Sequence, residues 1–266
     1  LKNLRIDIGG GGTNTASAFS RLGLKTGFLG KIGDDPEGYS ILNMLKKERI
    51  KFLGKMEKEA VSGYSIILDS KGGDRTILTY KGINNHLSWN EIKLRKLKTR
   101  WLYMSSLLGE SFVTQKKLVA YLASKGTKIA FNPSDYLIKR KDLNPILKYC
   151  DILVLNKEEA EMLIKKNKIK EKNLLIGLSE LGPRTVVITD KDKRVYAYNG
   201  KKYSIMPHKI KVVERTGAGD AFASGFVAGQ IVGMSIQKSL ELGLRESENI
   251  LKHVGAKNKL LRMRLR

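Results

Sequence analysis

The sequence predicts an α/β protein with a central, mainly parallel β-sheet flanked by helices on both faces. Strand-like and helix-like segments alternate regularly from Trp101 onward, which is the order typical of parallel sheets with crossover helices. The chain has 266 residues, of which 41% are hydrophobic, so it can bury one main core with a smaller appendage. Because ligands bind beyond the carboxyl ends of the strands in such sheets, we expect a functional site along that edge.

Four short apolar segments are predicted to be the parallel strands: residues 101–105, 128–131, 151–155 and 185–189. A helix capped by Ser111 and ended by Gly126 separates the first two strands. Polar or glycine-rich residues follow the strands, and we expect them to share one ligand site: Asn132, Asn156, Thr189 and the turn around Gly217.

Two helices are predicted in the first fifty residues. The first begins at Thr15 and ends at Gly23, because glycine commonly ends a helix. The second begins at Pro36, with Asp35 as its N-cap.

A small sheet is predicted beside the main one. Residues 61–68 and 75–80 are rich in β-formers and are joined by a polar, glycine-containing segment, so they indicate a β-hairpin. We expect the hairpin to join residues 4–8 and 52–53 in one sheet with a dry face. The alternative is an ordinary edge of the main sheet.

A glycine-rich turn, Thr216-Gly217-Ala218-Gly219-Asp220, opens a predicted helix over residues 221–229. Backbone N–H groups and the helix dipole make such a turn a site for an anion. A carboxylate beside a phosphate site suits the role of accepting a proton from an attacking nucleophile, and Asp220 has that position. The alternative is purely structural: Thr216 caps the helix, and Asp220 is a favourable charge in its first turn.

A second glycine run, Gly9 to Gly12, is followed by Asn14. It lacks the third glycine of a dinucleotide-binding turn and the Gly-Lys-Ser/Thr of a P-loop. Glycines let a ligand lie flat on the backbone, and the Asn14 amide offers a donor and an acceptor, which suits adjacent sugar hydroxyls. The alternative is a plain loop in which Asn14 caps a helix.

The segment Asn156-Lys157-Glu158-Glu159 supports two compatible interpretations. Asn156 and Glu159 have the spacing of a helix capping box, which the spacing alone favours. The same amide and carboxylate oxygens could hold a hydrated Mg²⁺ beside phosphate groups.

Composition excludes several classes of protein. The chain carries 50 basic and 26 acidic residues, a net charge of +24, but its lysines are spread through nearly every segment and no nucleic-acid motif is present. We therefore expect no nucleic-acid partner, and residues 257–266 are predicted to be a solvated basic tail. The single Cys150 suits a reducing cytoplasm, and no apolar run reaches membrane-spanning length.

The two glycine-rich segments resemble the two signatures of the ribokinase-like (PfkB) carbohydrate kinases. The second signature resembles the run from Thr216 to Asp220; the first resembles Gly10 to Asn14 together with residues 30–38. The resemblance implies a ribokinase-like fold with a small β-sheet lid and ATP-dependent phosphorylation, with Mg²⁺, of a hydroxyl on a sugar or sugar-like substrate. From the single Cys150 we expect the enzyme to be cytoplasmic.

The resemblance assigns a role to each matching residue. Catalysis is implied for Asp220 as general base and for the N–H groups of Gly217, Ala218 and Gly219 as an anion hole. Substrate binding is implied for Gly10, Gly11, Asn14 and Asn84. ATP binding is implied for Asn156, Thr189, Thr216, Gly219 and Asn249, and magnesium binding through water for Asn156 and Glu159. The family has a Gly-containing turn after the threonine, whereas this chain has residues 190–194 there, and we expect Lys191 to supply charge to ATP instead.

The same resemblance divides the chain into a core, residues 11–47 and 85–266, and a lid, residues 1–10 and 48–84. An earlier strand of the family, bearing an Asp that grips the substrate, is missing from the sequence. Either the fragment starts late or part of the acceptor site is lost. A nucleoside kinase and a non-catalytic binding protein for sugar or nucleic acid remain alternatives. Dependence on a monovalent cation and a homodimer formed through the lid also stay open.

Overall fold

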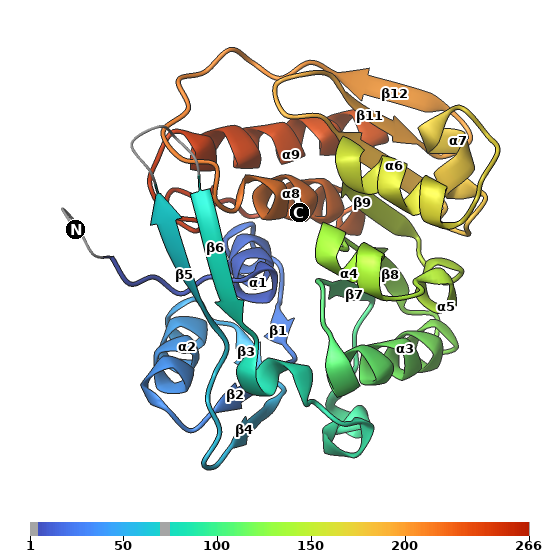
Figure 1. The fold of residues 1–266 in the computed structure, drawn as a ribbon. Helices are drawn as coiled ribbons and strands as arrows, with labels where there is room; N and C mark the ends of the chain where they lie inside the picture. The colour runs from blue at the N-terminus through green and yellow to red at the C-terminus, as the bar shows by residue number, and fades with distance from the viewer. Residues whose placement is uncertain (1–4, 70–74, 266) are drawn as a thin grey trace.

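A six-stranded mixed sheet forms the centre of the protein in the computed structural model, which describes residues 5–69 and 75–265 (Figure 1). Its strands lie in the order β12-β11-β10-β9-β8-β7. Their bounds are β7 Trp101–Met104, β8 Lys128–Phe131, β9 Ile152–Asn156, β10 Thr185–Thr189, β11 Val195–Tyr198 and β12 Lys202–Ile205. The first four are parallel, as predicted, whereas β11 pairs antiparallel with β10, and β12 pairs antiparallel with β11.

Helices cover both faces of this sheet. One face carries α3 Gly109–Ala123, α4 Asp135–Arg140, α5 Asn144–Leu147, α6 Lys157–Lys166 and α7 Leu174–Ser179, and the other carries α1 Gly11–Arg21, α8 Ala218–Ile231 and α9 Ile236–Leu251. Strand β9 explains why two cores form: Leu153 and Leu155 join the cluster under α3 to α7, while Ile152 and Val154 join the cluster under α1, α8 and α9. The predicted fold class is confirmed.

Helix α1 begins four residues earlier than the sequence indicates. Gly10 occupies the N-cap position with a φ of 91°, and the Asn14 N–H donates to the Gly10 carbonyl at 3.0 Å. Asn14 therefore lies inside the first turn, and the alternative in which it caps the helix is wrong. The second predicted helix, α2 Pro36–Lys47, is confirmed with Asp35 as its N-cap, which accepts the Gly38 N–H at 2.7 Å.

The expected single small sheet is wrong, because three separate two-stranded pairs replace it. These are β1 Gly27–Phe28 with β3 Lys51–Phe52, β2 Lys31–Gly33 with β4 Lys55–Glu57, and β5 Tyr64–Asp69 with β6 Arg75–Tyr80. Residues 5–8 form no strand, and Leu4 lies outside the described residues. The first two pairings join residues before position 47 to residues after it, so they tie the expected lid segment to the expected core.

The predicted hairpin, β5 with β6, is confirmed, although its turn at residues 70–74 lies outside the described residues. Cross-strand register places five large apolar side chains on one face, each 50–55% exposed: Tyr64, Ile66, Leu68, Leu78 and Tyr80. Three short 3₁₀ turns connect the hairpin to the main sheet: η1 Gly82–Asn85, η2 Trp89–Glu91 and η3 Leu94–Lys96. Figure 1 shows the hairpin running past α1, outside the central sheet.

Within residues 5–69 and 75–265, none of the helices combines the length and the hydrophobicity needed to cross a lipid bilayer.

Candidate active site

The turn before α8 requires a glycine at position 217. Gly217 is the N-cap of α8 and has a φ of 80°, a left-handed conformation that side chains disfavour. A Cβ on Gly217 would also lie 2.6 Å from the Cβ of Ala256. The glycine thus lets the turn pack against the segment Gly255-Ala256. The structural alternative in which Thr216 caps the helix is wrong, because the N-cap position belongs to Gly217.

Asp220 meets the other glycine-rich segment although 206 residues separate it from Asn14. The Asn14 Nδ2 donates to the Asp220 Oδ2 at 2.8 Å. A Cβ on Gly11 would lie 3.3 Å from the Asp220 Oδ1 and 2.9 Å from the Ser105 Oγ. The two helix N-termini, of α1 and α8, therefore bring both predicted signature segments to one carboxylate.

Lys257 completes this cluster, and it was not predicted. Its Nζ donates to the Asn14 Oδ1 at 3.0 Å and also contacts the Ile8 carbonyl oxygen. Because an ammonium group can only donate, it fixes the Asn14 oxygen toward itself and leaves the Asn14 NH₂ to face Asp220. The predicted solvated tail over residues 257–266 is thus wrong at Lys257, since this side chain turns inward.

Opposing influences act on the pKa of the Asp220 carboxyl, and the net shift is upward. Burial raises the pKa of the Asp220 carboxyl, while the hydrogen bond from Asn14 and the charge of Lys257 lower it. Burial likewise lowers the pKa of Lys257 to about 8, opposed by the charges of Asp7 and Asp220. A buried carboxyl and a half-buried ammonium whose pKa values are both shifted are typical of functional sites.

A cavity of about 250 Å³ lies at the carboxyl ends of β8, β9 and β10. Asp220 lines it together with residues at or just after the ends of these strands and at the start of α8: Asn132, Asn156, Glu159, Thr189, Gly217 and Gly219. The structure therefore brings together the four positions that the sequence indicates, although the expectation that the turn around Gly217 follows a strand is wrong, since β12 ends at Ile205. Their gathering at one edge is the expected consequence of a parallel sheet.

The capping box at the start of α6 is present. The Glu159 N–H donates to the Asn156 Oδ1, and the Asn156 N–H donates to the Glu159 Oε2, both at 2.8 Å. Burial raises the pKa of Glu159 to about 7. Among the described residues, no three His, Cys, Asp or Glu side chains cluster as metal ligands. The donor set therefore fits a hydrated ion held mainly by phosphate oxygens, with Glu159 nearby, and does not fit a cage of protein ligands.

Several predicted site residues do not line this cavity. Lys191 is exposed, and its Nζ pairs with the Glu158 Oε1 at 3.0 Å. Asn249 donates to the Lys259 carbonyl at 2.5 Å, and the Asn84 side chain lies at η1 against Gly63. Three further predicted residues do not line the cavity, but each is next in sequence to a residue of the site: Gly10, Thr216 and Ala218.

The sequence model for the pfkB family carbohydrate kinases matches residues 1–262, so the chain belongs to this family of kinases. A ribokinase from Haemophilus influenzae is 30% identical over 251 residues, which cover 91% of this chain and 80% of the relative. An uncharacterized sugar kinase from Archaeoglobus fulgidus is 29% identical over 251 residues, covering 91% of this chain and 98% of the relative. A cytidine kinase from Thermococcus kodakarensis is 28% identical, with coverage of 93% and 88%.

Solved structures agree on the fold. The crystal structure of a ribokinase from Thermotoga maritima has a TM-score of 0.85 and 22% identity, covering 97% of this chain and 86% of its own. An adenosine kinase from Schistosoma mansoni in complex with 2-fluoroadenosine has a TM-score of 0.87 and 21% identity, with coverage of 96% and 82%. A putative ribokinase II from E. coli in complex with ATP and Mg²⁺ has a TM-score of 0.85 and 18% identity, with coverage of 99% and 89%. The chain has the ribokinase fold.

Proposed function

We propose that the protein transfers a phosphoryl group from ATP to a hydroxyl of a sugar or sugar-like substrate, with Asp220 as general base. One observation carries this proposal: Asn14 and the N-terminus of α8 hold Asp220 at the wall of the strand-end cavity. The family of this chain makes the reaction class a kinase reaction. The acceptor and the residue roles are the proposed part.

In the proposed mechanism, Asp220 takes the proton of the acceptor hydroxyl as that oxygen attacks phosphorus. When bound, ATP would supply the phosphoryl group, and Mg²⁺ would partly neutralise the charge of the phosphates. The N–H groups of Gly217, Ala218 and Gly219 stabilise the remaining negative charge at the helix N-terminus. Gly10, Gly11 and Asn14 position the acceptor. The lack of a side chain on Gly11 leaves room next to the Asp220 Oδ1 and the Ser105 Oγ.

Residues of the cavity are proposed to hold the nucleotide. Asn156, Thr189 and Gly219 line it and offer polar groups to phosphates, and Glu159 is placed to hold Mg²⁺ through water. Thr216 stands directly before the anion hole. Lys191 would have to leave Glu158 to reach a phosphate, and Asn249 would have to leave its bond to the Lys259 carbonyl, so these two assignments have the least support.

Replacing Lys257 with Met is expected to move the acid limb of the pH profile of kcat/KM to higher pH. The Lys257 charge lowers the pKa of Asp220, so its removal leaves Asp220 protonated, and unable to accept a proton, up to a higher pH. The measurement is kcat/KM between pH 5 and pH 9. Lys257→Arg keeps the charge and serves as the control. An acid limb that stays in place in Lys257→Met would rule out this influence on the base.

The acceptor is expected to be a free sugar. The relatives include a ribokinase and a cytidine kinase, so a nucleoside is the second candidate. A screen of free sugars against nucleosides, with ATP and Mg²⁺ and with or without K⁺, should give ADP release with a sugar. Release with nucleosides alone would favour the nucleoside kinase, and the K⁺ arm tests dependence on a monovalent cation. No transfer at all, with tight salt-dependent binding of nucleic acid, would favour the non-catalytic alternative.

We also propose that residues 48–84, with residues 1–10, act as a lid on the core, and that two copies pair through it. The apolar face of the hairpin supports this, because large apolar patches on a surface commonly mark an interaction site. The double variant Ile66→Glu/Leu78→Lys keeps the net charge and should convert a dimer to a monomer in light scattering. The control, Ile67→Glu/Ile77→Lys, changes the opposite face of the same hairpin. A monomeric unmodified protein would contradict the pairing.

A further inference from the structure

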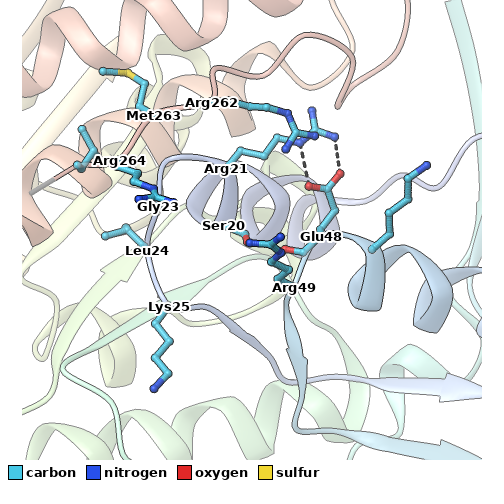
Figure 2. Close-up of a pocket in the computed structure, with 12 residues that line it drawn as sticks. Ser20, Arg21, Gly23, Leu24, Lys25, Glu48, Arg49, Arg262, Met263 and Arg264 are labelled. Atoms are coloured by element: carbon cyan, nitrogen blue, oxygen red, sulfur yellow. Dashed lines mark hydrogen bonds and ion pairs between the residues drawn. The ribbon is translucent and has the colours of Figure 1, made fainter.

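A larger cavity, of about 880 Å³, lies at the other end of α1 from Asp220 (Figure 2). The ends of α1 and α2 and residues 262–265 line it. The Met263 N–H donates to the Arg21 carbonyl at 3.0 Å, and the Leu265 N–H donates to the Leu22 carbonyl at 3.1 Å. These backbone bonds fix the last described residues as one wall of the cavity.

The walls of this cavity carry charge of almost one sign. Six basic side chains line it, and one acid does: Arg21, Lys25, Lys47, Arg49, Arg262 and Arg264 against Glu48. The lining therefore has a net charge of six minus one, or +5.

The one carboxylate, that of Glu48, already forms an ion pair with Arg21. Arg21 binds both Glu48 oxygens, with its Nε at 2.9 Å and its Nη2 at 2.5 Å. This hydrogen bonding lowers the pKa of Glu48, and the charges of Arg262 and Lys47 lower it further. Figure 2 shows Arg21 and Arg262 reaching toward the same carboxylate. Within the part of the chain that the structure describes, no ion pair neutralises the other five cations.

Helix ends explain only part of this charge. A cation in the last turn of a helix is favourable, which accounts for Arg21 and Lys47. It does not account for Arg262 and Arg264, which lie on a separate segment and bring their charges to the same hollow. A concave site lined by one sign of charge concentrates the potential and attracts ions of the opposite sign.

We propose that this cavity binds a small molecule that carries two or more phosphate groups. Guanidinium groups match phosphate oxygens in geometry, and four of the six cations are arginines. A single phosphate, with a charge near −2, would leave most of the +5 uncompensated. The volume lies in the range of small-molecule sites, and Leu24, Met263 and Leu265 offer an apolar wall for the rest of the ligand.

Arg21 connects this cavity to the catalytic cluster. Its Nη1 donates to the Lys257 carbonyl at 2.7 Å, and the Lys257 ammonium holds Asn14, which holds Asp220. A ligand that binds Arg21 therefore acts on Lys257, which is two contacts away from the general base, Asp220. This coupling, unlike the binding itself, rests on the proposed function.

Binding is tested with inorganic tripolyphosphate as the probe, by calorimetry, at constant free Mg²⁺. No nucleotide is added, because an ATP analogue carries the same phosphate groups as the probe and would fill this cavity too; binding of the probe at the catalytic cavity is common to all the proteins compared. We expect one further site, at least tenfold weaker in the variant Arg49→Gln/Arg262→Gln. The control, Lys170→Gln/Lys172→Gln, removes the same charge from an exposed loop and should bind as the unmodified protein does. No further site, or an equal loss in both variants, would overturn the proposal.

The coupling is tested by steady-state kinetics with the same probe. We expect tripolyphosphate to change the KM for the acceptor or kcat at least twofold in the unmodified protein and in the loop control, and not in Arg49→Gln/Arg262→Gln. Unchanged kinetics at saturating probe would overturn the coupling. Calorimetry needs no turnover, so a failure of the proposed phosphoryl transfer would not be mistaken for a failure of binding.

Discussion

Asp220→Asn is expected to lower kcat by roughly 10²- to 10⁴-fold, the usual contribution of a general base. The substitution keeps the shape of the side chain and an oxygen that can accept the Asn14 hydrogen bond, so the cluster should persist. It removes only the group that takes the proton. The measurement is ADP formation with the acceptor found in the screen, at saturating ATP and Mg²⁺.

The control for this substitution is Asp192→Asn, which makes the same change in charge at an exposed position outside the cavity. It should retain full activity. Thermal unfolding of both variants checks that the loss in Asp220→Asn is not a loss of folding. Turnover in Asp220→Asn equal to that of the unmodified protein would remove Asp220 as the base.

Gly217→Ala is expected to abolish most activity and to destabilise the fold by about 1–3 kcal/mol. The new Cβ faces two obstacles: a φ of 80° and a distance of 2.6 Å to the Ala256 Cβ. Either the turn or the segment Gly255-Ala256 must shift, and the N–H groups of the anion hole would then point elsewhere. Activity and the midpoint of thermal unfolding are the two measurements.

Two matched controls separate the effect of backbone strain at a positive φ from the effect of displacing the turn before α8. Gly233 has a φ of 79° and open space around it, so Gly233→Ala carries the same backbone strain away from the site. It should lose stability but keep kcat. Gly219→Ala meets no atom within 4 Å and has no left-handed φ, so it should keep the fold. Full activity in Gly217→Ala would show that the turn before α8 does not stabilise the transferring group.

The main sheet was predictable from the sequence because three of its four parallel strands, β8, β9 and β10, are buried on both faces. Strand β9, Ile152–Asn156, is a continuous apolar run of that kind. The two antiparallel strands were missed since they are short, partly exposed and rich in tyrosine and lysine, as in β12 Lys202–Ile205. The small sheets were mispredicted because two- and three-residue strands carry no periodicity that could fix their partners.

The candidate site was predictable where local sequence determines geometry. A glycine-rich turn before a helix and a polar residue after a buried strand both place their groups through backbone rules. Lys257 follows no such rule, because its contact with Asn14 spans 243 positions and depends on how the last segment packs. The basic cavity was also beyond the sequence, since its cations come from three distant segments and look evenly scattered along the chain.

The central claim is that the N–H groups of Gly217, Ala218 and Gly219 cradle the transferring phosphoryl group while Asp220 receives the acceptor proton. A crystal structure with a non-hydrolysable ATP analogue, Mg²⁺ and the acceptor tests it most directly. The account predicts the terminal phosphate within hydrogen-bonding distance of these N–H groups, and the acceptor hydroxyl about 3 Å from an Asp220 oxygen. A terminal phosphate bound away from the start of α8, or an acceptor that does not reach Asp220, would contradict it.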